Sequence, residues 1–125
     1  MQTWISISLA ANIVVLVPIV VLMAIQSSLI DEAWGPSTAA RGILMSIYMA
    51  ILIASAVLVF LPVPAFIAAL LAVQVVYKVT TPFTVGSFIN PVVVSNLLIS
   101  GLHMATLAAI YSEVGTRMFQ TSPLI

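Results

Sequence analysis

The sequence predicts an all-α integral membrane protein, a single bundle of four transmembrane helices. Charged residues make up 5% of the 125 residues and apolar residues 63%, whereas an ordinary soluble domain has about 25% and 45–50%. The apolar residues also fall in long segments, close to the roughly 20 residues that a helix needs to cross about 30 Å of hydrocarbon. Since the chain is short, we expect one domain covering residues 1–125.

The first span is predicted at about residues 3–25, with Trp4 where an interfacial aromatic residue belongs. No Lys or Arg precedes this segment, and it is longer than the roughly 7–15 apolar residues of a secretory signal, so we expect a retained helix. Pro18 lies inside it and predicts a bend, because it leaves the carbonyl of Val14 without a helical donor. Residues 26–40 hold Asp31, Glu32 and a turn at 34–36, and we expect them to be aqueous.

The second span is predicted at 42–61, a segment without any charge, and Ser37 or Thr38 can cap its start. Pro62 and Pro64 end it, because proline removes backbone donors and disfavours continuous helix. Pro64 suits the first position of the third helix. The short connection predicts that the second and third spans form an antiparallel hairpin.

The third span, at about 64–81, is interrupted by Lys78 after few apolar residues. Two interpretations are open. Lys78 extends its ammonium toward the membrane surface while the helix continues to Thr81, or residues 81–89, which contain Pro82 and Gly86, fold back as a re-entrant element.

The fourth span, at about 91–111, begins with Asn90-Pro91, an N-cap followed by proline at the first helical position. Orientation in the membrane is not determined. Arg41 and Lys78 fall on one side and Arg117 on the other, a smaller bias than the positive-inside rule requires.

A polar stripe on the fourth span is the main candidate site. Asn96, Ser100 and His103 are spaced four and three residues apart, so they share one helical face, and Thr106 lies close to that face. An ionisable group at membrane depth generally faces the bundle interior. Either His103 hydrogen-bonds to another helix and stabilises the fold, or the stripe binds a ligand or handles protons.

A second polar group comprises Gln74, Tyr77 and Lys78 at the end of the third span. Lys and Tyr at a helix end are typical of interfacial anchoring. The functional alternative is that Lys78 meets an anionic headgroup or a quinone-like carbonyl. Asn12 and Tyr48 are further inward-facing candidates.

Small residues recur at intervals of four, which favours close helix packing in lipid. The positions are Gly42, Ser46, Ala50 and Ala54 on the second span and Gly101, Ala105 and Ala109 on the fourth. Their partner is either another helix of the chain or another subunit.

Several function classes are disfavoured. The chain has no cysteine and a formal net charge of zero, and no glycine-rich phosphate loop or metal-spaced His/Asp cluster occurs. We therefore expect no enzyme, no catalytic residues, no metal, no cofactor and no nucleic-acid partner. The leading hypothesis is a non-catalytic accessory membrane subunit that packs against other membrane proteins or against copies of itself. The alternative is a small transporter, channel or lipid- or quinone-binding protein that uses the stripe around His103.

Overall fold

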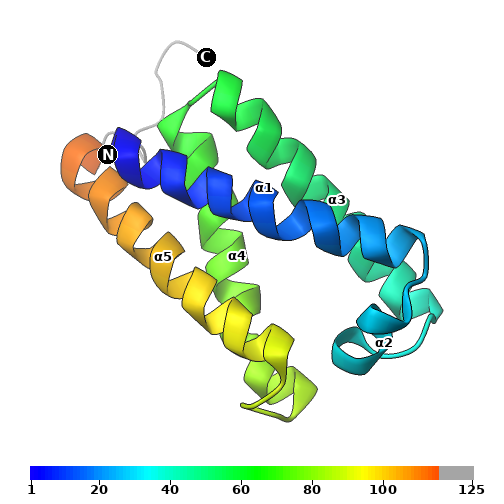
Figure 1. Cartoon of the computed structure of the whole chain (residues 1–125). Helices are drawn as coiled ribbons and strands as arrows, with labels where there is room; N and C mark the ends of the chain where they lie inside the picture. The colour runs from blue at the N-terminus through cyan, green and yellow to red at the C-terminus, as the bar shows by residue number, and fades with distance from the viewer. Residues whose placement is uncertain (116–125) are drawn as a thin grey trace.

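The computed structural model describes residues 1–115, and all of its regular structure is helical (Figure 1). The helices are α1 (Gln2–Ala24), α2 (Ser28–Trp34), α3 (Ala39–Phe60), α4 (Pro64–Val85) and α5 (Pro91–Val114). Four of them, α1, α3, α4 and α5, are long and apolar enough to cross a membrane. The predicted all-α bundle of four candidate spans is confirmed. Arg117, which entered the question of orientation, lies outside the described residues.

The helices start where polar side chains can satisfy free backbone N–H groups. Ser27 accepts from Leu29 N at the start of α2, and Thr38 accepts from Arg41 N at the start of α3. Asn90 Oδ1 accepts from Val92 N over 2.8 Å at the start of α5. α4 has no side-chain cap, but it begins with Pro64, whose missing N–H needs no partner.

α4 extends further than the sequence predicts. It continues past Lys78 and through Pro82 to Val85, and ends at Gly86 with a left-handed φ of +78°. The alternative of a re-entrant element over residues 81–89 is therefore wrong. The effect of Pro82 is local, because it removes one backbone donor and crowds only the preceding turn of the helix. The hydroxyls of Thr81 and Thr84 hydrogen-bond to helix carbonyls in this region.

The segment between the first two spans contains a short helix, α2, that the sequence interpretation missed. Arg41 holds this segment by hydrogen bonds to the Asp31 carboxylate and, over 2.8 Å, to Gly35 O. Asn90 Nδ2 donates to Ala33 O over 3.2 Å, which ties α2 to the start of α5. The predicted aqueous connector is thus a structured element that contacts two spans.

The four long helices form two antiparallel pairs, α1 with α3 and α4 with α5. The pairs meet where α1 begins and α5 ends, and there the N-terminal amine lies 2.9 Å from Glu113 Oε1. From that end the pairs diverge toward α2 and the α4–α5 connection (Figure 1). The bundle is therefore narrow at one end and wide at the other.

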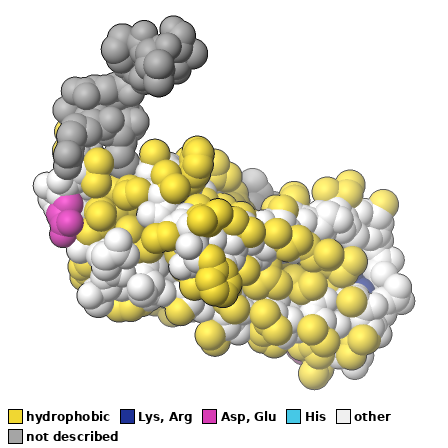
Figure 2. All heavy atoms as spheres, turned by 90° about the horizontal axis from the view of Figure 1, so that it is seen from above, with side chains coloured by type: hydrophobic (Ala, Val, Ile, Leu, Met, Phe, Trp, Pro, Cys, Tyr) yellow, Lys and Arg dark blue, Asp and Glu magenta, His cyan; other side chains and the backbone are white. Residues whose placement is uncertain are grey.

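Apolar side chains are spread over the face of the molecule drawn in Figure 2. Val14, Val73 and Leu98, one each on α1, α4 and α5, are 71%, 66% and 73% exposed near the middle of their helices. Water would penalise this exposure at about 25 cal/mol per Å² of apolar surface. Lipid removes that penalty, so the exposed apolar surface and the lengths of the helices both favour a membrane environment.

Candidate functional site

His103 is the centre of a buried hydrogen-bond network that joins three spans. Its fully buried imidazole lies twelve residues into α5, about 18 Å along the helix. Nδ1 lies 3.1 Å from Ser8 Oγ and Nε2 lies 3.0 Å from Asn12 Oδ1. Asn12 Nδ2 donates to Ser55 Oγ over 3.0 Å. The network therefore links α5 to α1 and α1 to α3 halfway along the bundle.

Donors and acceptors in this network follow from the chemistry of the groups. Because Asn12 Nδ2 donates to Ser55, Asn12 Oδ1 is the atom that faces the ring, and Nε2 must carry a hydrogen. In the neutral imidazole Nδ1 then accepts from the Ser8 hydroxyl. Ser8 Oγ lies 2.6 Å from Thr106 Oγ1, which supplies the next hydroxyl. Both ring nitrogens of His103 are thus used within the protein.

The polar stripe predicted on α5 is buried, but its members have different partners. Thr106 Oγ1 is within 3.2 Å of Trp4 O on α1, in addition to Ser8. Ser100 Oγ donates to Leu97 O in its own helix. Asn96 Nδ2 is 3.5 Å from Thr81 Oγ1 on α4. The stripe is therefore two sites, one that joins α5 to α1 around His103 and one that faces α4 around Asn96.

Lys78 lies inside the bundle, with 4% of its surface exposed. Nζ donates to Tyr77 Oη over 2.9 Å and lies 4.8 Å from the centre of that ring. The outward anchoring expected from the sequence does not describe this position, because a buried ammonium does not reach along the outer surface. Its one hydrogen bond leaves two of its three donors without a partner in the part of the protein that the structure describes.

Gln74 lies one helical turn before Lys78 on α4 and is fully buried. Neither Nε2 nor Oε1 of its amide has a hydrogen-bond partner among the described residues, 1–115. A buried amide without partners is destabilising by about 1–3 kcal/mol. Gln74 and Lys78 together give the buried face of α4 more hydrogen-bonding capacity than the protein uses.

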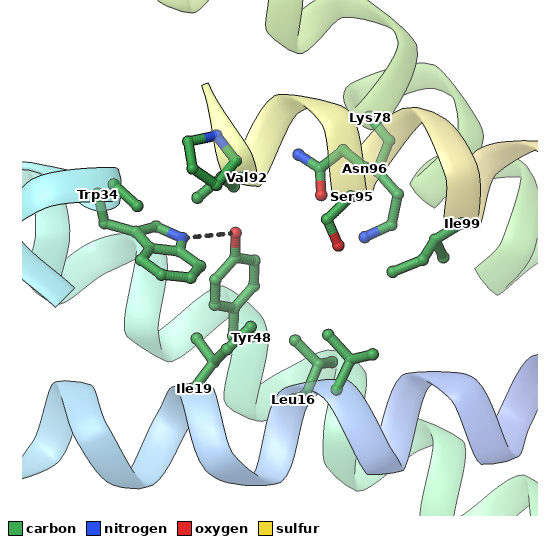
Figure 3. A pocket seen from close by; sticks show the side chains of 12 residues that line it. Leu16, Ile19, Trp34, Tyr48, Lys78, Val92, Ser95, Asn96 and Ile99 are labelled. Atoms are coloured by element: carbon green, nitrogen blue, oxygen red, sulfur yellow. Dashed lines mark hydrogen bonds between the residues drawn. The ribbon is translucent and has the colours of Figure 1, made fainter. Parts of the chain in front are cut away.

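A cavity of about 110 Å³ lies beside Lys78, between the two helix pairs. In Figure 3 the ammonium of Lys78 and the hydroxyl of Ser95 point into the space bounded by Leu16 and Ile99. Asn96 also lines it. The cavity thus combines apolar walls with a few polar groups, which is typical of small-molecule sites.

α2 contributes to this cavity at the wide end of the bundle (Figure 1). Trp34 lines the cavity, and its Nε1 donates to Tyr48 Oη over 3.3 Å (Figure 3). A second cavity of about 440 Å³ shares Trp34, Tyr48 and Asn96 with the first and extends to Glu32 and Tyr77. The inward position of Tyr48 agrees with the sequence prediction, as does that of Asn12.

The predicted helix-packing residues lie largely on the outside of the bundle. Gly42, Ser46, Ala50 and Gly101 are exposed, and Ala54, Ala105 and Ala109 are half-buried. A Cβ added at Gly42 or Gly101 would meet no other atom within 4 Å. These two glycines therefore do not allow a close approach between helices of this chain. Packing against another subunit stays a prediction.

Sequence reasoning missed Ser8 and Ser55, which complete the network around His103. Ser8 and Asn12 are four residues apart, so they share one face of α1 as the polar residues of α5 share theirs. That spacing was a usable signal. Ser55 has no such companion, and its position follows from the packing of α3 on α1 alone.

Fold and surface together define a class, a small helical bundle with four candidate membrane spans and, toward one end, an apolar cavity that contains a few polar groups. Residues 1–115 hold no group of three or more His, Cys, Asp or Glu side chains able to bind a metal ion. No protein-family model, curated protein or solved structure matches the chain.

Proposed function

We propose that this chain is a non-catalytic, multi-pass membrane protein that binds the polar head of an amphipathic molecule in the cavity between its two helix pairs. One observation carries the proposal: Lys78 is buried, faces the cavity and has no ion-pair partner among residues 1–115. An ionisable group at membrane depth is costly, and such groups mark functional positions more often than structural ones.

Two features support binding over catalysis. His103, the residue best suited to act as a base, already uses both ring nitrogens in bonds to Ser8 and Asn12. Lys78, Ser95 and Asn96 face the cavity beside apolar side chains of α1 and α5. Such a lining suits a molecule with a polar head and an apolar body.

Trp34 offers a direct test, because it lines the cavity and the chain has two tryptophans. With Trp4→Phe, Trp34 becomes the sole tryptophan, and its emission can be excited selectively. Titrating this variant, in an uncharged detergent, with a spin-labelled single-chain lipid should quench Trp34 fluorescence along a saturable curve. In the matched Trp34→Phe variant, Trp4 reports from near the opposite end of α1, and we expect weak quenching without saturation.

A cavity-filling substitution separates binding from nonspecific partitioning. Ser95→Phe should abolish the saturable component, because the ring would occupy the space beside Lys78. Ser112→Phe is the control, since Ser112 is exposed on the same helix and far from the cavity. Equal, unsaturable quenching in all these variants would rule out the proposed function.

A second candidate function is that of a subunit in a larger membrane assembly. It is favoured by the outward ridge of Gly42, Ser46 and Ala50 on α3, since close helix packing in lipid uses small residues. Native mass spectrometry of protein from mild detergent tests it. If the wild type self-associates or copurifies with another protein, and Ala50→Leu loses that association, this function is supported. A wild-type protein that is monomeric and copurifies with nothing argues against it.

A further inference from the structure

We propose that the head bound beside Lys78 carries a net negative charge, from a phosphate or carboxylate on an amphipathic molecule that enters from the lipid. This inference rests on the proposed function and adds the chemical class of the ligand. The competing class is a neutral carbonyl head such as that of a quinone. The charges, the depth of the site and its unused hydrogen bonds favour the anion.

Lys78 differs from the other cationic groups of residues 1–115 because it has no carboxylate partner. In residues 1–115 the other cationic groups have partners, Arg41 with Asp31 and the N-terminal amine with Glu113. Lys78 has a tyrosine hydroxyl and no carboxylate. Charges removed from water are generally paired. An anionic ligand would supply the missing partner, and a neutral carbonyl would not.

The depth of Lys78 suits a lipid-borne head. Lys78 is seven residues before Val85, the last residue of α4, which places it about 10 Å from the helix end. Since α4 is about as long as a hydrocarbon core of about 30 Å is thick, that depth lies inside the core, below the headgroups that border it. An anion tethered to an apolar tail can reach it without leaving the lipid.

Hydrogen-bonding capacity near Lys78 matches an oxygen-rich head. Within residues 1–115, two ammonium hydrogens of Lys78 and the amide of Gln74, one turn deeper on the same face, lack hydrogen-bond partners. Ser95 adds a hydroxyl to the cavity lining. Phosphate and carboxylate oxygens accept several hydrogen bonds at once, and charge-assisted bonds are about twice as strong as neutral ones.

The route from water is less suited to a free anion. The larger adjoining cavity, which extends away from Lys78, includes the exposed residue Glu32. Glu32 has no ion pair within the part of the chain that the structure describes. Its charge would repel an anion that arrives from solution. Entry from the lipid would avoid that carboxylate, because Glu32 does not line the smaller cavity, whose apolar wall is formed by residues of α1 and α5.

The test compares head chemistries on the Trp4→Phe protein, with Trp34 fluorescence as the readout. The probes are dihexanoyl phosphatidylglycerol, dihexanoyl phosphatidylcholine, a short-chain quinone and inorganic phosphate. We expect phosphatidylglycerol to bind at least about tenfold more tightly than phosphatidylcholine or the quinone, as one charge-assisted hydrogen bond allows. Inorganic phosphate should not displace it.

Substitutions at Lys78 connect this preference to the ammonium. Lys78→Gln should bring the two lipids to within about twofold of each other, and Lys78→Arg should keep the preference. Circular dichroism melting verifies that both variants fold, and the comparison of lipids on the Trp4→Phe protein does not depend on them.

Each contrary result has its own meaning. Equal saturable binding of both lipids, or quinone binding as tight as phosphatidylglycerol, would overturn the anionic class while the proposed function stands. Displacement by inorganic phosphate would overturn the lipid-borne source. A preference unchanged in Lys78→Gln would remove Lys78 from the site. Absence of saturable binding by every probe would overturn the proposed function as well.

Discussion

His103 and Lys78 are both buried ionisable residues in neighbouring spans, yet their surroundings differ. His103 has a protein partner at each ring nitrogen, so it contributes to the packing of α5 on α1. Lys78 has one hydroxyl partner and a cavity beside it. A polar residue whose bonds are complete stabilises the fold, and one whose bonds are incomplete is available to a ligand.

Replacing His103 by Ala should therefore lower stability. The change leaves Asn12 Oδ1 and Ser8 Oγ without the ring and opens a cavity, which together should cost about 2–3 kcal/mol. Chemical unfolding followed by circular dichroism in detergent measures the loss. Ser100→Ala is the control, since its hydroxyl bonds within its own helix, and we expect about 0.5 kcal/mol or less. Equal stability of His103→Ala and the wild type would refute the structural role.

Replacing Gln74 should change stability in the opposite direction. Met has a similar length and no unsatisfied donor or acceptor, so Gln74→Met should raise the free energy of unfolding by about 1 kcal/mol. If Gln74 serves the ligand, the same variant should bind phosphatidylglycerol more weakly in the Trp34 assay. A clear loss of stability would mean that the amide has partners, such as bound water.

Residue positions on helical faces were predictable, and their partners were not. The spacing of Asn96, Ser100 and His103 placed them on one face, which the structure shows to be buried. The spacing of polar residues along each helix could not predict that Asn12 and Ser8 of α1 would meet His103, because that contact depends on how the two helices cross. The inward turn of Lys78 was missed for the same reason.

At the scale of elements, helix ends followed local chemistry closely. Proline and capping residues placed the starts of α4 and α5 at Pro64 and Pro91, as predicted. The C-terminal end of α4 was misjudged because Lys78 and Pro82 were read as helix-ending signals. The helix tolerates both, since Lys78 turns into the bundle and Gly86 supplies the left-handed C-cap.

Asn90 serves two elements at once, and two substitutions can separate its contributions. Asn90→Ala removes both the cap of α5 and the bond to Ala33 O on α2, and should cost about 1–2 kcal/mol. Asn90→Asp keeps an N-cap acceptor but loses the donor to Ala33.

Hydrogen exchange read by mass spectrometry distinguishes the two effects. Asn90→Asp should increase exchange in α2 while the start of α5 stays protected, and Asn90→Ala should increase exchange in both. Unchanged α2 exchange in Asn90→Asp would show that the bond to Ala33 does not hold α2 in place.

At the scale of the whole molecule, four helices that are long and apolar enough to cross a bilayer pack as two antiparallel pairs. Composition predicted the spans, because no other solvent accommodates so much apolar surface in so short a chain. The divergence of the pairs and the cavity between them were not predictable. They depend on the crossing of α1 with α5, which no local pattern in either helix encodes.

The most direct test is labelling of single cysteines by a membrane-impermeant maleimide in sealed vesicles, and the chain suits it because it has no native cysteine. Gln2→Cys and Val63→Cys should label from one side, and Ser37→Cys and Ser87→Cys from the other. Val73→Cys, exposed halfway along α4, should not label from either side. Labelling of Val63→Cys and Ser37→Cys from the same side, or ready labelling of Val73→Cys, would contradict the four-span arrangement.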